Sequence, residues 1–127
     1  MDETRNICVV LCINEDVSSR PEIMEITYGM EEEGIPYLIR TSDEKRLEDL
    51  ARIASMDSQL DVGIGVDEHL TGGIYYDKLP EDHLLFRMNL LKEKEKARNM
   101  GINAARLVKG IPFNMGCLLY TSPSPRD

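Results

Sequence analysis

A short apolar run near the start of the chain indicates the class of fold. Residues 7–13 are rich in β-branched side chains and too few to form a buried helix, so we expect a strand covered on both faces. Further strands are expected at residues 36–40, 61–66 and 72–76, and helical patterns separate the first three strands. This alternation predicts an α/β fold: a single domain with a mostly parallel sheet flanked by helices.

The first expected helix opens at residues 19–22, where Ser19 and Glu22 have the spacing of a capping box, and it ends before Gly34. Its buried stripe consists of Ile23, Ile26 and Met30. A second capping box at residues 41–44 is expected to open another helix. The inward residues of that helix are Leu47, Leu50, Ala51 and Ala54.

A third helix is expected over residues 92–108, with Gly110 ending it. Residues 83–91, just before it, have no clear pattern. A stripe of small side chains would let another backbone, in the sheet or in a neighbouring helix, approach this helix closely. The stripe recurs every four positions and consists of Ala97, Gly101 and Ala105.

The net charge of −8 argues against nucleic acid and an anionic membrane surface as partners, because both would need a basic surface. No apolar run approaches the roughly 20 residues of a transmembrane helix. The charge is also unevenly distributed: residues 14–33 carry seven acids and one base, whereas residues 92–109 carry six bases and two acids. Such polarity suits a protein that docks onto a partner. Three cysteines without paired spacing, and no signal-peptide pattern, indicate a cytoplasmic protein.

The end of the chain differs in composition from the rest. Residues 117–127 have no periodic pattern, and residues 121–125 alternate Ser or Thr with Pro, which is typical of disordered chain. We therefore expect residues 1–116 to form the functional domain. Residues 117–127 are expected to be a non-native, disordered tail.

The cysteines and the strand glycines have an ordinary structural explanation. Cys8 and Cys12 share one face of the first strand and have no companion His, which favours buried thiols over a metal or redox pair. Four glycines lie in expected strands rather than before a helix N-terminus, which favours close packing over phosphate binding. They are Gly63, Gly65, Gly72 and Gly73.

The loop after the third strand is a candidate site for a small molecule. Asp67 and His69 follow the carboxyl end of that strand, where open α/β sheets bind ligands. An Asp with a nearby His can perform acid–base or metal chemistry, but this combination is also common in loops. His83 is a weaker candidate for the same chemistry. The sequence assembles no catalytic set of nucleophile, base and oxyanion site, so catalytic residues are expected to be none.

An acidic triplet ends the first expected helix: Glu31, Glu32 and Glu33. The C-terminal end of a helix dipole is already negative, so acids there lose stability. Acids kept in that position favour a use for one of them, as a ligand of a hard cation or in contact with a basic partner. The alternative is an ordinary solvated helix end.

Residues 29–37 and 98–113 together resemble the small subunit of the diol/glycerol dehydratase reactivating factor. Residues 62–69 and 75–80 are similar to the middle section of the same family, in the same order, and the resemblance covers residues 7–113. The resemblance implies a fold similar to that of the medium subunit of the dehydratase. It also implies a chaperone-like, non-catalytic role rather than an enzyme.

In the family that the chain resembles, the small subunit pairs with a large ATPase subunit, and a two-plus-two heterotetramer is implied. ATP and ADP bind the large subunit only. The small subunit exchanges with the medium subunit of adenosylcobalamin-dependent dehydratase, meets the dehydratase large subunit, and lets damaged cobalamin leave. The implied setting is the cytoplasm, with association with a bacterial microcompartment left open, and no membrane or nucleic acid takes part.

The resemblance also implies a Mg²⁺ ion at the interface with the large subunit. Its ligand from the small subunit is the middle acid of the triplet, which is Glu32 here. Glu31 and Glu33 are not expected to share this role, because a helix turns by about 100° per residue. Arg106 and Lys109 are expected to meet an acidic surface of a partner.

Two alternatives remain open from the sequence. One is the medium subunit of the dehydratase itself, although such chains are generally longer. The other is a stand-alone small-molecule-binding α/β domain that uses the loop near Asp67. A subunit of an assembly is expected to leave an apolar or charged patch uncovered, which a stand-alone domain has no reason to do.

Overall fold

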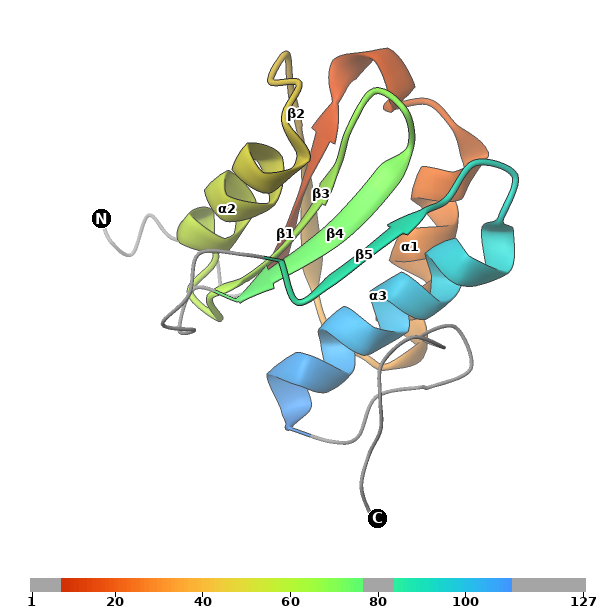
Figure 1. The fold of residues 1–127 in the computed structure, drawn as a ribbon. Coiled ribbons are helices and arrows are strands. Elements are labelled where there is room, and N and C mark those ends of the chain that lie inside the picture. The colour runs from red at the N-terminus through yellow and green to blue at the C-terminus, as the bar shows by residue number, and fades with distance from the viewer. Residues whose placement is uncertain (1–7, 77–83, 111–127) are drawn as a thin grey trace.

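In the computed structural model, which describes residues 8–76 and 84–110, five strands form one sheet in the order β2-β1-β3-β4-β5 (Figure 1). The strands are β1 (Val9–Asn14), β2 (Tyr37–Ser42), β3 (Val62–Val66), β4 (Thr71–Tyr76) and β5 (Phe86–Asn89). β1 pairs in parallel with β2 and β3, whereas β4 and β5 add antiparallel. The α/β fold is confirmed, and the sheet is mixed because only a short turn joins β3 to β4, whereas parallel neighbours need a long crossover.

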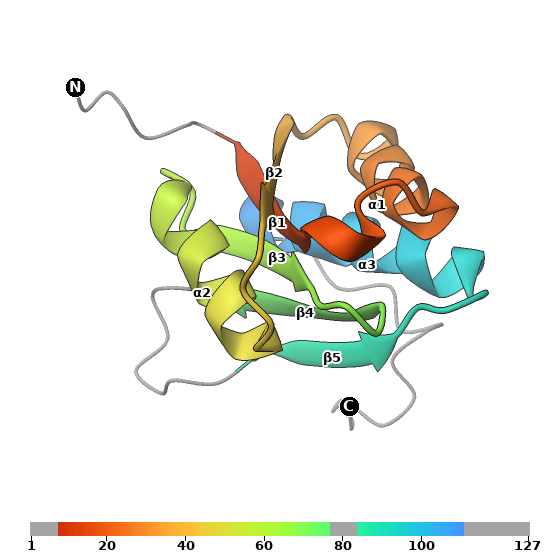
Figure 2. The ribbon, with the colours of Figure 1, turned by 90° about the horizontal axis from the view of Figure 1, so that it is seen from above.

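Helices cover both faces of this sheet. A single 3-10 turn (Glu15–Val17) precedes α1 (Pro21–Glu32), and the other helices are α2 (Leu47–Asp57) and α3 (Lys94–Lys109). Figure 2 shows α2 on one side of the sheet and α1 with α3 on the other. The larger apolar core lies under α1 and α3, and a smaller one lies under α2. Within residues 8–76 and 84–110, no helix has the length and apolar character to cross a membrane.

The expected stripe of small residues on α3 is confirmed as a contact surface, and the element that it contacts is α1. A Cβ atom at Gly101 would lie 2.0 Å from the carbonyl oxygen of Ile26, and one at Gly29 would lie 2.1 Å from that of Arg98. Both positions need glycine, because no side chain fits into such a gap. The two helices therefore lie side by side in backbone contact.

Both predicted capping boxes are wrong, because neither Ser19 nor Thr41 caps the helix that follows it. The N-cap position of α1 is Arg20, without a side-chain cap, and Glu22 instead pairs with Arg20 and accepts a hydrogen bond from the backbone N–H of Lys92. Helix α2 begins only at Leu47, because Ser42 still belongs to β2. The inward stripes of both helices are buried as predicted.

Two of the expectations from sequence cannot be compared with the fold. His83 and the proposed tail, residues 117–127, lie outside the described residues. Residues 83–91, which have no clear pattern in the sequence, contain β5. Within β5 only Phe86 is buried.

Candidate functional site

The acidic triplet at the end of α1 gives each of its carboxylates a different partner. The pairs are Glu31 with Tyr37, Glu32 with Arg98 and Glu33 with Lys109, at 2.9, 2.9 and 3.0 Å. Glu32 and Glu33 thus pair with bases from residues 92–109 of the same chain. These cations offset the negative end of the α1 dipole, which explains how the helix keeps three acids there.

Glu33 is committed to holding the two helices together. Its side chain is only 15% exposed, and Lys109 Nζ donates both to its carboxylate and to its carbonyl oxygen, each at 3.0 Å. Arg106 Nε lies 3.5 Å from the other carboxylate oxygen. The hydrogen bond from Lys109 lowers the pKa of Glu33 below its ordinary value. The C-terminal turns of α1 and α3 are thus tied together by one ionised carboxylate.

The predicted interface residues Arg106 and Lys109 lie in this same cluster. Their side chains are 32% and 34% exposed, and their charged ends face Glu33. Each therefore has a structural role within the chain, and contact with a partner stays a prediction for the part of each side chain that reaches the surface.

Glu32 has a more accessible position than Glu33, with 47% of its side chain exposed. Arg98 donates from Nη1 to Glu32 and from Nη2 and Nε to Glu25, at 2.9, 2.8 and 3.1 Å. The guanidinium carbon of Arg98 also lies 5.6 Å from the centre of the Tyr28 ring. Glu25, Glu32 and Arg98 line a groove of about 530 Å³ between α1 and α3.

Glu25 and Arg98, which lie beside Glu32, were not predicted from the sequence. Glu25 and Glu32 are seven positions apart, so the helical period alone places them on one face of α1. That signal was available in the sequence. The role of Arg98 was not, because no local pattern gives the register between α1 and α3.

The donor groups of this chain fit Mg²⁺ only as part of a larger site. Among residues 8–76 and 84–110, no group of three or more His, Cys, Asp or Glu side chains could hold a metal ion. Mg²⁺ is often held by one or two carboxylates, with waters and ligands from other molecules completing an octahedron. The half-exposed carboxylate of Glu32 fits such a role as a single ligand.

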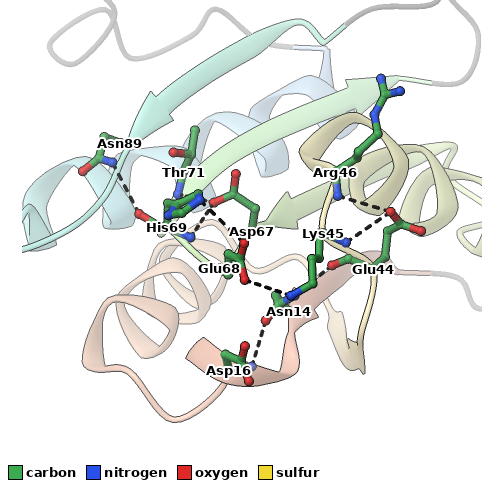
Figure 3. A network of polar contacts seen from close by, with 10 residues as sticks. All are labelled: Asn14, Asp16, Glu44, Lys45, Arg46, Asp67, Glu68, His69, Thr71 and Asn89. Carbon is green, nitrogen blue, oxygen red and sulfur yellow. Dashed lines mark hydrogen bonds and ion pairs between the residues drawn. The ribbon is translucent and has the colours of Figure 1, made fainter.

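The loop after β3, the alternative site, is held by hydrogen bonds within the loop and by contacts with Lys45 and Asn89 (Figure 3). Asp67 is buried, and its Oδ1 accepts hydrogen bonds from the backbone N–H groups of His69 and Thr71, at 2.9 and 3.0 Å. Glu68 pairs with Lys45 at 3.2 Å, and its other oxygen lies 3.6 Å from the exposed His69 ring. The Asp67 contact with His69 is made by the backbone, so these two side chains do not form an acid–base pair.

The structural explanation of the cysteines and of the β3 glycines is confirmed. Cys8 and Cys12 are buried free thiols, and burial raises the pKa of both, which is the opposite of what a reactive thiolate needs. A Cβ atom at Gly63 would lie 2.2 Å from the backbone nitrogen of Ser55 in α2. Gly65 makes a similarly close approach to the same helix.

Comparison with known proteins finds relatives over most of the chain. A family model for the dehydratase medium subunit matches residues 8–114. The propanediol dehydratase-reactivating factor small subunit of Salmonella typhimurium is 40% identical over 105 residues, which are 83% of this chain and 87% of that protein. The diol dehydratase-reactivating factor small subunit of Klebsiella michiganensis is 42% identical over 89 residues, 70% of each chain.

Two solved structures are similar over most of their length. One is glycerol dehydratase reactivase, with a TM-score of 0.78 and 29% identity, and the other is diol dehydratase-reactivating factor complexed with ADP and Mg²⁺, with a TM-score of 0.74 and 34% identity. In both cases the match covers 84% of this chain and 96% of the other. The chain therefore belongs to the dehydratase medium subunit family, among the small subunits of the diol and glycerol dehydratase-reactivating factors.

Proposed function

We propose that this chain is the non-catalytic partner of a large ATPase subunit and that it releases damaged cobalamin from adenosylcobalamin-dependent dehydratase by subunit exchange. Two findings support the exchange. The relatives are named as small subunits of reactivating factors, while the matching family is described as the dehydratase medium subunit. A chain that resembles the medium subunit has the shape needed to replace it beside the dehydratase large subunit.

A Mg²⁺ ion at the interface with the large subunit is the second part of the proposal, with Glu32 as the ligand from this chain. The observation that carries it is the placement of Glu32, half-exposed beside a groove that two more carboxylates line, Glu25 and Glu95. Its partner Arg98 is also partly exposed, and exposed ion pairs contribute only about 0–1 kcal/mol. A metal ion therefore displaces or shares this contact at little cost.

ATP and ADP bind the large subunit in this proposal. Within the described residues, Gly63, Gly65, Gly72 and Gly73 lie inside β3 and β4 rather than in a loop that leads into a helix N-terminus. We place the assembly in the cytoplasm, in keeping with the free thiols of Cys8 and Cys12.

Native mass spectrometry tests the exchange. The chain is mixed with the cognate large reactivase subunit, ADP and Mg²⁺, and whole dehydratase is then added in excess. The proposal predicts a stoichiometric complex of small and large subunits, followed by the appearance of the small subunit with the dehydratase large subunit when whole dehydratase is supplied. A soluble chain that forms neither complex would contradict the proposal.

A further inference from the structure

The outer edge of β2 is open for pairing with another strand. β2 lies at one end of the sheet, between α2 and α1 in Figure 2, and within residues 8–76 and 84–110 only β1 pairs with it. An edge strand presents unpaired backbone N–H and C=O groups to its surroundings. Proteins usually protect such an edge with a charged side chain, a proline or a bulge. An edge without this protection favours contact with a further strand.

The residues of β2 that direct their backbone groups outward are Tyr37, Ile39 and Thr41. The backbone N–H of Val9 donates to the carbonyl oxygen of Pro36 at 3.1 Å, so Pro36 faces β1. Successive residues of a strand face opposite neighbours, and the odd-numbered residues of β2 therefore face away from β1. The missing N–H of Pro36 lies on the β1 side and does not interrupt the outer edge.

The side chains of β2 give this edge little protection. Ile39, an apolar residue, is 40% exposed. Arg40 is the only charged residue of the strand, and its guanidinium group is paired with the carboxylate of Asp57 in α2. Because this charge is already compensated, it repels an approaching strand less than a free arginine would.

An apolar groove continues the edge on the α2 side of the sheet. Its volume is about 310 Å³, and it is lined by Val10 and Cys12 of β1 and by Ile53 and Met56 of α2, next to Arg40. Ile53 and Met56 are 47% and 58% exposed. Apolar surface therefore borders the open strand, on the opposite side of the sheet from α1 and the candidate metal ligand.

A second copy of this chain fits the edge by symmetry. When two β2 strands pair antiparallel about a two-fold axis at Ile39, each Ile39 opposes the other, and Tyr37 opposes Thr41. These residues face outward, so every opposing pair exchanges both of its backbone hydrogen bonds. Arg40 opposes Leu38 in this register, and no two like charges within β2 are directly opposite. The axis is perpendicular to the sheet, so both α2 grooves lie on one face and meet across it.

We propose that this chain forms a homodimer through antiparallel pairing of β2 with β2 of a second copy, with Ile53 and Met56 of the two α2 helices packing together beside the joined strands. The two sheets become one continuous sheet. This interface needs neither Glu32 nor Mg²⁺, so the inference does not rest on the proposed function and concerns chains that are free of other subunits.

Sedimentation-velocity ultracentrifugation of the full chain across the micromolar range tests the proposal. The unaltered chain is expected to dimerise, and Ile39→Lys is expected to weaken the dimer by at least about tenfold, because the two lysines oppose each other at the axis. Met56→Lys is expected to weaken it as well. Leu91→Lys is the matched control: Leu91 is 45% exposed and follows β5, at the other edge of the sheet, and its replacement is expected to change nothing.

A cysteine at the axis tests the register. The Cα atoms of opposing residues in such a hydrogen-bonded pair lie about 5.5 Å apart, which a disulfide can span. Mild oxidation of Ile39→Cys is therefore expected to give a covalent dimer on a non-reducing gel. Leu91→Cys is expected to stay monomeric on the same gel, and the unaltered chain, in which Cys8 and Cys12 are buried, gives the background.

A chain that stays monomeric across the concentration range would overturn the proposal. So would a dimer that both Ile39→Lys and Met56→Lys leave intact, or one that Leu91→Lys alone disrupts. If the chain is monomeric and Ile39→Lys instead weakens its binding to the large reactivase subunit, the edge belongs to that subunit and the homodimer is wrong. Met56→Lys keeps the test decisive if Ile39→Lys does not fold.

Discussion

The two helical layers of the domain are held to the rest of the molecule in different ways. α1 and α3 are connected by ion pairs between residues 66 to 76 positions apart, and by glycine contacts between their backbones. α2 packs on the sheet through a small apolar cluster and through Gly63 and Gly65 of β3. Two exposed ion pairs also join α2 to strands, Glu48 with Arg87 and Asp57 with Arg40. The α1–α3 layer therefore differs in its backbone contact between helices, in the half-buried ion pairs of Glu33 and in the candidate partner site, whereas the α2 layer mainly completes the core.

The largest effect is expected where the two helices of the α1–α3 layer are in closest contact. Gly101→Ala would place a methyl group 2.0 Å from the carbonyl oxygen of Ile26, so the helices must separate. We expect a loss of about 3 kcal/mol or more in the free energy of unfolding, measured by urea denaturation. Gly34→Ala is the control: its φ of 73° is strained for alanine, but no atom lies within 4 Å, and we expect a loss of about 1 kcal/mol. Equal losses would mean that the helix contact is not tight.

A smaller loss is expected at the other end of the same helix pair. Glu22 is buried, and although burial alone would raise its pKa, the bonds from Arg20 and the Lys92 N–H bring the net pKa below its ordinary value. Glu22→Ala leaves the Lys92 N–H without its acceptor, so we expect a loss of about 2 kcal/mol in the free energy of unfolding. Glu15→Ala, which alters an exposed acid nearby, is expected to change little. A Glu22→Ala protein as stable as the unaltered chain would refute this role.

Periodicity in the sequence was enough to predict every described α-helix and strand except β5, and the buried faces of α1 and α2. The strands at residues 61–66 and 72–76 and the inward residues of α1 and α2 lie where the pattern predicts them. The first capping box failed because Glu22 accepts a hydrogen bond from the distant backbone N–H of Lys92. The second failed because Ser42 still lies in β2 and α2 begins only at Leu47. The short strand β5 was not predicted, because only Phe86 in it is buried and the strand therefore shows no alternating apolar pattern. The pairing of Glu32 with Arg98 could not be predicted, since it depends on the register of two helices.

The ion pair at Glu33 predicts a modest dependence of stability on pH. Because the folded-state pKa of Glu33 is lowered, its contribution is complete above the ordinary glutamate pKa of about 4.3 and disappears as the pH falls through the lower value. Glu33→Gln is therefore expected to cost at most about 1 kcal/mol at pH 7, and the difference from the unaltered chain should shrink below about pH 4. Thermal unfolding across this range checks it, and a difference that stays constant with pH would exclude the ion pair as the cause.

The smallest effect is expected outside both layers. Deleting residues 117–127 is predicted to leave the melting temperature and the pairing with the large subunit unchanged, because these residues are expected to be a non-native tail. Differential scanning calorimetry of the two chain lengths provides the comparison. A clear fall in melting temperature would show that the segment belongs to the domain.

Glu32 and Glu33 are neighbouring acids with different exposure and partners, and only Glu32 is proposed to bind Mg²⁺. The most direct test is the affinity of the chain for the large reactivase subunit, titrated with ADP in Mg²⁺ or in EDTA, for the unaltered chain, Glu32→Ala and Glu33→Ala. We predict that EDTA and Glu32→Ala each weaken binding, that Glu32→Ala abolishes the effect of Mg²⁺, and that Glu33→Ala keeps that effect while lowering stability. Equal losses of Mg²⁺ dependence for both variants would contradict the account and reduce the triplet to a general acidic patch.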